Sequence, residues 1–212
     1  MTDRTFVGFG FGAIQAGLFL FEAYYSRHFK RLVVAEVMDD VVAAVRKSGG
    51  MYRVNVAMPG GIEQHEIRGV EILNPRVADD RKVLIQAIAE AAELSTALPS
   101  VKFYGTGKEG DVVDILGRGL KQKLENPALP AAVIYTGENH NHAAEIMDEA
   151  LVKGPGIKGQ GRFQSLNTVI GKMSGVVTDP AQMQEQKLAC VVDGMARAFL
   201  VEKFNRILIT KI

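Results

Sequence analysis

The first residues along the chain whose types and spacing suggest chemistry form a glycine-rich run. The run Phe9-Gly10-Phe11-Gly12-Ala13-Ile14-Gln15-Ala16-Gly17 follows an apolar stretch and opens a segment with apolar residues at helical spacing. In such a run a first glycine permits a tight turn, a second lets the backbone approach a pyrophosphate, and the helix amides that follow bind the anion. The candidate contacts to a dinucleotide cofactor are Gly10, Phe11, Gly12, Ala13 and Ile14. The fingerprint is weak by itself, because glycines also serve plain strand-to-helix turns.

The third glycine position of this fingerprint holds a different residue. Counted from Gly10, that position falls on Gln15, and a bulky residue there is expected to tilt the pyrophosphate or the first helix. An overlapping register of Gly8, Gly10 and Ala13 also satisfies the pattern, in which alanine is allowed at the third position. Both registers stay open at this point.

Glu36 supplies the acidic partner of a dinucleotide site. It lies near the end of the apolar run 32–37, 24 residues beyond Gly12. A carboxylate there can accept hydrogen bonds from the ribose hydroxyls of an adenosine, and it repels a 2′-phosphate. Glu36, with the neighbouring Val37, therefore predicts NAD rather than NADP as the cofactor. The plainer alternative is a solvated carboxylate at a strand end.

The order of the predicted elements indicates how these residues are positioned. Apolar runs and helical spacing alternate at the start of the chain, which predicts strands at 5–9 and 32–37 and helices at 13–27 and 39–47. This is the order of a parallel βαβ unit. Further strands are predicted at 93–98, 131–136 and 162–170, and further helices at 79–92, 109–124 and 139–152. The predicted fold class is α/β, a Rossmann-type doubly wound and mostly parallel sheet with extra antiparallel strands.

Two stretches are less regular. Residues 62–73 predict a short hairpin or meander, because polar and apolar residues are mixed after a Pro-Gly-Gly turn. Residues 197–209 fit a helix slightly better than a strand by the spacing of their apolar side chains.

Polar residues follow two of the later predicted strands. Thr96 and Ala97 end one strand at the edge of the sheet where nucleotides bind, and Glu138 and Asn139 follow the next. For Thr96 the alternative is an ordinary strand end before a proline. Asn139 also suits the N-cap of the helix predicted after it.

The two histidines at 140 and 142 suggest a metal site at first sight. Residues two positions apart on a helix point to different faces, so the pair is not placed to share a metal ion. We predict that these histidines are solvated and that the chain has no metal site.

Four blocks in this order resemble one known family. They are the run 9–17, Leu94-Ser95-Thr96-Ala97-Leu98-Pro99, Thr136-Gly137-Glu138-Asn139, and Asn167-Thr168-Val169-Ile170-Gly171-Lys172. Over essentially its whole length the chain is similar to the mannitol-1-phosphate 5-dehydrogenase and mannitol dehydrogenase family of long-chain polyol dehydrogenases. It departs from that family where Gly171-Lys172 replaces an Asp-Arg pair and where Gln15 replaces the third glycine.

The resemblance implies an oxidoreductase that transfers a hydride between NAD and a polyol or sugar phosphate. It implies that four residues lie around the nicotinamide: Thr96, Ala97, Glu138 and Asn139. It further implies that Asn167 is catalytic and helps to polarise the reacting oxygen beside a lysine, since an amide donor suits a developing alkoxide. A turn or cap asparagine is the plainer alternative. Lys172 would bind a phosphate or carboxylate of the substrate, or is otherwise a solvated lysine.

The same resemblance implies that residues 1–212 are the NAD-binding domain of a two-domain enzyme. The Lys-x-x-x-x-Asn-x-x-His block of the family's helical catalytic domain is absent from the sequence. We therefore expect the chain alone to bind NAD without turnover, with a missing C-terminal domain or a partner chain completing the enzyme. A fragment, a natural half-protein, a subunit, and a non-catalytic NAD-binding module or redox sensor all stay open.

Composition limits the partners. The chain has 212 residues, with 25 Lys and Arg against 24 Asp and Glu and a net charge of +1. This balance excludes a broad electrostatic surface for nucleic acid or for an anionic membrane. A single cysteine, Cys190, fits a reducing compartment, and no apolar run reaches the roughly 18 residues of a membrane span. We expect a cytoplasmic protein with a small-molecule partner; mannitol 1-phosphate, a free polyol and a hexuronate all fit.

Overall fold

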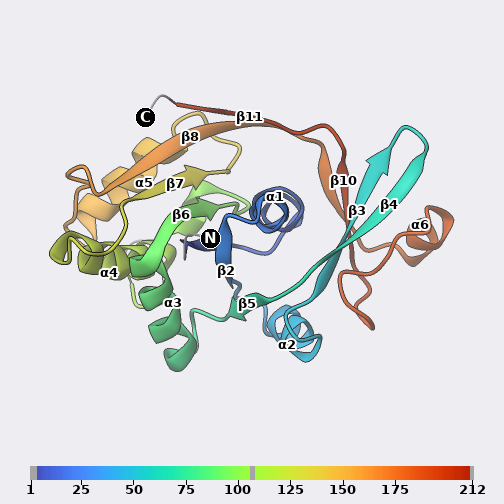
Figure 1. The fold of residues 1–212 in the computed structure, drawn as a ribbon, viewed down its shortest axis with the longest axis horizontal. Helices are drawn as coiled ribbons and strands as arrows, with labels where there is room; N and C mark the ends of the chain where they lie inside the picture. The colour runs from blue at the N-terminus through green and yellow to red at the C-terminus, as the bar shows by residue number, and fades with distance from the viewer. Residues whose placement is uncertain (1–3, 106–107, 211–212) are drawn as a thin grey trace.

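The centre of the molecule is a seven-stranded sheet (Figure 1). The structure is a computed structural model that describes residues 4–105 and 108–210. The strand order is β11-β8-β7-β6-β1-β2-β5, in which six strands are parallel and β11 runs antiparallel to β8. The strands are β1 (Arg4–Phe9), β2 (Phe29–Ala35), β5 (Val70–Leu73), β6 (Ala91–Thr96), β7 (Ala132–Thr136), β8 (Phe163–Gly171) and β11 (Arg206–Ile209). The predicted Rossmann-type α/β fold is confirmed.

The chain crosses over between β5 and β6, so the strand order reverses next to β1. From β1 the chain builds outward through β2 and β5, and then returns to place β6, β7 and β8 on the other side of β1. In open α/β sheets, ligands bind beyond the carboxyl ends of the strands at such a reversal. The glycine-rich run that follows β1 and the residues that follow β6 therefore lie at the same crevice.

Helices cover both faces of this sheet. They are α1 (Leu20–Ser26), preceded by the π-helical turn η1 (Gln15–Phe19), then α2 (Asp39–Lys47), α3 (Ala78–Glu90), the 3₁₀ turn η2 (Val101–Tyr104), α4 (Val112–Glu125) and α5 (Ala143–Lys153). The short helix α6 (Pro180–Glu185) lies instead beside a second sheet, against which its Met183 packs. Alternation along β1 separates two cores: Phe6 packs with residues of α1 and α2, whereas Val7 packs with residues of α3, α4 and α5. None of the described helices has the length and apolarity to cross a membrane.

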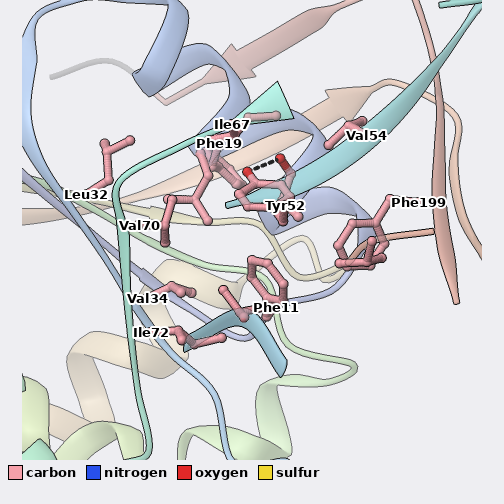
Figure 2. Packing of buried hydrophobic residues seen from close by; sticks show 14 of the residues in the cluster. Phe11, Phe19, Leu32, Val34, Tyr52, Val54, Ile67, Val70, Ile72 and Phe199 are labelled. Atoms are coloured by element: carbon pink, nitrogen blue, oxygen red, sulfur yellow. Dashed lines mark hydrogen bonds between the residues drawn. The ribbon is translucent and has the colours of Figure 1, made fainter. Parts of the chain in front are cut away.

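A second, four-stranded sheet packs against the first helix. Its order is β4-β3-β10-β9, with β3 (Tyr52–Met58), β4 (Gly61–Ile67), β9 (Ser174–Val177) and β10 (Ala198–Glu202). Figure 2 shows Phe11 of the glycine-rich run facing Tyr52 and Phe199 of this sheet. Its ring meets those of Tyr52 and Phe199 edge to face, at centroid distances of 5.0 and 5.6 Å. The Tyr52 hydroxyl also donates to the Ala16 carbonyl at 2.8 Å, so the second sheet braces the loop and the helix after it.

One charged side chain is enclosed in the opposite core. Lys123 of α4 is completely buried, and its ammonium donates to the carbonyls of Ala89, Ala91 and Pro130 at 2.7–2.8 Å. Three carbonyl acceptors match the three protons of an ammonium, which is the condition under which a buried charge is tolerated. The contacts join the end of α3, the start of β6 and the approach to β7.

The structure corrects several predicted elements. The helix favoured at 197–209 is wrong, because β10 and β11 occupy this stretch and find their partners in β3, β9 and β8. The hairpin or meander predicted within 62–73 is wrong, because β4 and β5 belong to different sheets: β4 pairs back on β3, and β5 joins the main sheet beside β2. The helix predicted from residue 139 begins at Ala143, because residues 137–142 form the turn that leads out of β7.

Candidate functional site

The glycine-rich run turns tightly at one glycine and is open at another. Gly10 has φ +85°, and a Cβ there would lie 3.0 Å from the Ala97 carbonyl oxygen, so this position requires glycine. A Cβ on Gly12 would have no other atom within 4 Å, so the backbone at Gly12 faces open space. The run therefore has the shape that the fingerprint predicts, with the tight turn first and the position of close ligand approach second.

The helix after the turn presents backbone amides without partners. Residues 13–26 are continuously helical, and the first helical hydrogen bond runs from the Ala16 amide to the Gly12 carbonyl at 2.8 Å. The amides of Gly12, Ala13 and Ile14 donate to no group in the described part of the chain. Free amides at the positive end of a helix dipole form a site for an anion.

Phe11 anchors the loop rather than facing the crevice. Its side chain is 3% exposed in the core described above, and its amide donates to the Glu36 carboxylate at 2.9 Å. Phe11 was one of the five loop residues predicted to contact a cofactor. Because its side chain and its amide are both engaged within the protein, neither is available to a cofactor.

Gln15 fits at the third glycine position because Gly8 makes room for it. Gln15 is fully buried, and its side-chain carbonyl accepts a hydrogen bond from the Ser95 hydroxyl at 3.0 Å. A Cβ on Gly8 would overlap the end of the Gln15 side chain. In the usual fingerprint the third glycine lets the helix approach the strand closely. Here the small residue is on β1 instead of on the helix, and the helix opens into the π-helical turn that starts at Gln15.

Glu36 is buried against the loop. The residue is 9% exposed, and its carboxylate accepts three amide hydrogen bonds: from Phe11 at 2.9 Å, Val37 at 2.7 Å and Met38 at 2.9 Å. The alternative of a solvated strand end is therefore wrong. Since two carboxylate oxygens offer about four acceptor positions, Glu36 keeps capacity for a further donor. Val37 is 42% exposed beside it.

A second buried carboxylate braces the other side of the crevice. Glu138 is 4% exposed and accepts hydrogen bonds from the Thr96 hydroxyl at 2.8 Å, the Leu98 amide at 2.9 Å and the Tyr104 hydroxyl at 2.5 Å. Burial, with the charge of Glu138, raises the pKa of Tyr104 far above its usual value. Thr96 and Glu138 thus come together as predicted, but they bond to each other. Tyr104 was not among the predicted residues, since it belongs to no motif and comes from the short turn η2.

Asn167 caps a helix from a distant strand. Its side-chain carbonyl accepts from the Ala144 amide at 2.8 Å, and its amide group donates to Glu145 at 2.7 Å. The hydrogen bond from Asn167 lowers the pKa of Glu145. The predicted cap, Asn139, is exposed in the turn before the helix and makes no capping bond, so that prediction is wrong. The first turn of α5 is thus capped by Asn167, the residue to which the family resemblance gave a catalytic role and for which a cap was the plainer alternative.

A cavity of about 770 Å³ brings several of the predicted residues together. Five of them line it: Ile14, Glu138, Asn139, Asn167 and Lys172. The Lys172 ammonium donates to the Glu202 carbonyl at 2.7 Å, and burial lowers the pKa of this lysine. His140 and His142, which were predicted to be solvated and not to share a metal ion, also line the cavity. No group of three potential metal ligands is found within the described ranges.

The comparisons with known proteins concern the fold. No protein-family model and no curated protein sequence matches the chain. Among solved structures, mannitol 2-dehydrogenase of Pseudomonas fluorescens, solved as a ternary complex with NAD and D-mannitol, superposes on 100% of this chain with a TM-score of 0.70 and 13% identity. The chain shares its fold with this dehydrogenase. A D-sorbitol dehydrogenase in substrate-free form superposes on 98% of the chain with a TM-score of 0.72 and 11% identity.

The chain spans about half the length of these two dehydrogenases, since the superposition covers 50% of each of them. The resemblance stated from four sequence blocks is confirmed for the fold. Identities of 11–13% show a shared fold, and the function has to be argued from the site itself.

Proposed function

We propose that the chain binds NAD and forms the cofactor-binding part of an oxidoreductase that acts on a polyol or sugar phosphate. One observation carries the proposal: free helix amides and the open backbone at Gly12 adjoin a buried carboxylate, Glu36, at the point where the strand order reverses. The residues present fit a dinucleotide, because a Cβ on Gly12 would fill the space that a pyrophosphate needs. The solved complex of the mannitol 2-dehydrogenase with NAD supports this proposal.

Each part of the crevice has a role in this proposal. The amides of Gly12, Ala13 and Ile14 would hold the pyrophosphate, and Glu36 would accept from the adenosine ribose while excluding a 2′-phosphate. The Thr96–Glu138 bond would keep β6 and β7 at a fixed spacing around the nicotinamide. When bound, NAD supplies the hydride acceptor for oxidation of an alcohol carbon.

The cavity beside the crevice would receive the substrate. The Asn167 amide group has two protons and gives one to Glu145, so the second can donate to the reacting oxygen. The Lys172 ammonium donates to the carbonyls of Glu202 at 2.7 Å and Phe204 at 3.5 Å, and its third proton can bind a phosphate or carboxylate of the substrate. The base that removes the hydroxyl proton would come from a second domain or a partner chain. We therefore expect cofactor binding without turnover by this chain alone.

We expect the Gly12→Ala variant to lose affinity for NAD while keeping its stability. The new methyl group faces open space, so the free energy of unfolding should change by less than about 0.5 kcal/mol. The same methyl group would hold a pyrophosphate away from the backbone, and calorimetry should give an affinity for NAD at least about tenfold weaker. Equal affinity in both proteins would remove the loop from the proposed site.

A further inference from the structure

A second cavity, of about 380 Å³, lies between α1 and the strands β7 and β11. Figure 1 shows α1 at the centre of the molecule, with β8 and β11 passing over it toward the second sheet. Six side chains of the cavity lining matter for its chemistry: the rings of Phe6, Phe19, Phe29 and Tyr135, and the carboxylates of Glu22 and Glu93. The two cavities have one lining residue in common, Ile209, so this cavity is separate from the one proposed to receive the substrate.

The aromatic walls of this cavity are arranged in two pairs. Phe6 and Phe29 meet edge to face at a centroid distance of 5.6 Å, and Phe19 stacks on Tyr135 at 6.1 Å with 19° between the ring planes. Phe6 and Phe19 are buried behind Phe29 and Tyr135, which are half-buried, so a ligand would reach chiefly the rings of Phe29 and Tyr135. The face of an aromatic ring carries partial negative charge and attracts a cation. The walls therefore favour an apolar body that carries a positive charge.

The two carboxylates add full negative charge to the same cavity. Glu93 accepts a hydrogen bond from the Tyr135 hydroxyl at 3.1 Å, and Glu22 accepts one from the Asn205 amide group. Burial and the charge of Glu93 raise the pKa of Tyr135 to about 12.

Neither carboxylate forms an ion pair with a basic side chain of the described residues. His28, which also lines the cavity, is exposed and bonds to neither carboxylate, and Lys172 senses the charge of Glu22 without pairing with it. Glu93 is half-buried whereas Glu22 is exposed, so Glu93 is the carboxylate that a cationic partner would stabilise most. The cavity thus has two acceptors placed for a cation and repels an anion.

We propose that this cavity binds a small organic cation, a primary ammonium group on an aromatic body. The ammonium would donate to Glu93, with Glu22 adding its charge at the exposed side, and the aromatic body would lie against the half-buried rings of Phe29 and Tyr135. The volume is at the lower end of the range of small-molecule pockets, which suits a ligand of one ring. The charge distinguishes this ligand from a neutral alcohol of the same shape, which would gain from the rings but not from the carboxylates.

The test compares two probes of the same shape, benzylammonium and benzyl alcohol, by NMR titration of the full chain at pH 7 and 0.15 M salt. We expect benzylammonium to bind at least about tenfold more tightly than benzyl alcohol. In the Glu93→Gln variant, which keeps an acceptor for Tyr135, that preference should fall by about fivefold or more, with the affinity for benzyl alcohol unchanged. Glu185→Gln on α6 makes the same change of charge away from the cavity and should leave both affinities unchanged.

A second variant separates binding from any damage to the fold. Phe29→Leu removes one half-buried ring of the lining and keeps both carboxylates, so both probes should bind more weakly while the preference for benzylammonium persists. Equal affinity for the two probes, an unchanged preference in Glu93→Gln, or absence of benzylammonium binding at millimolar concentration would overturn the proposal.

Discussion

The Glu138→Ala variant is expected to unfold with a free energy about 3–4 kcal/mol below that of the wild type. The substitution leaves three donors without their acceptor: the hydroxyls of Thr96 and Tyr104 and the amide of Leu98. Thr96 and Tyr104 are almost completely buried, so water does not readily replace the carboxylate. Urea unfolding followed by circular dichroism measures the difference.

Two milder variants check this explanation. Tyr104→Phe removes a single hydroxyl and leaves Glu138 with two donors, so it should cost about 1 kcal/mol. Glu138→Gln keeps one oxygen acceptor and should fall between Tyr104→Phe and Glu138→Ala. If Glu138→Ala cost less than about 1 kcal/mol, the carboxylate would not be the brace between β6 and β7 that the geometry indicates.

The Gly8→Ala variant is expected to lose about 2 kcal/mol of stability, because its methyl group overlaps the buried Gln15 side chain. Gln15→Ala makes room for that methyl group at the expense of the hydrogen bond from Ser95. In the Gln15→Ala background, the added cost of Gly8→Ala should therefore shrink by at least about 1 kcal/mol. A double-mutant cycle of urea unfolding measures this coupling.

Gly175 provides a matched control for this cycle. It also lies within a strand, β9, but a Cβ there would have no other atom within 4 Å. Gly175→Ala should cost far less than Gly8→Ala in either background. Additive effects of Gly8→Ala and Gln15→Ala would mean that the two positions do not share space, and that the departure from the glycine fingerprint has another explanation.

Local patterns were sufficient to predict much of the fold. The strands and helices of the first βαβ unit and the crevice at Gly10, Glu36 and Thr96 follow from apolar periodicity, turn residues and the order of elements. The stretch 197–209 was misread because β10 and β11 are strands that depend on partners far along the chain, which the spacing of one segment does not contain.

The candidate site was predicted in its residues but less well in their contacts. Asn167 caps α5 from 23 positions further along the chain, and no sequence pattern near either residue signals that contact. The hydrogen bond from Tyr104 to Glu138 and the three carbonyls around the Lys123 ammonium also join segments that are distant in the sequence, so no local pattern predicts them. The sequence offered two overlapping glycine registers, but the way Gly8 makes room for Gln15 was not predicted and required the geometry of the loop.

The most direct test of the proposed function is calorimetry of NAD and NADP binding to the wild type and to Glu36→Ala. Because Glu36 also holds the loop through the amides of Phe11, Val37 and Met38, its loss should weaken both cofactors, and the ratio of the two affinities is the informative quantity. We predict that the wild type binds NAD at least about tenfold more tightly than NADP and that the ratio falls close to one in Glu36→Ala. Absence of NAD binding by the wild type, or an unchanged ratio in the variant, would contradict the account.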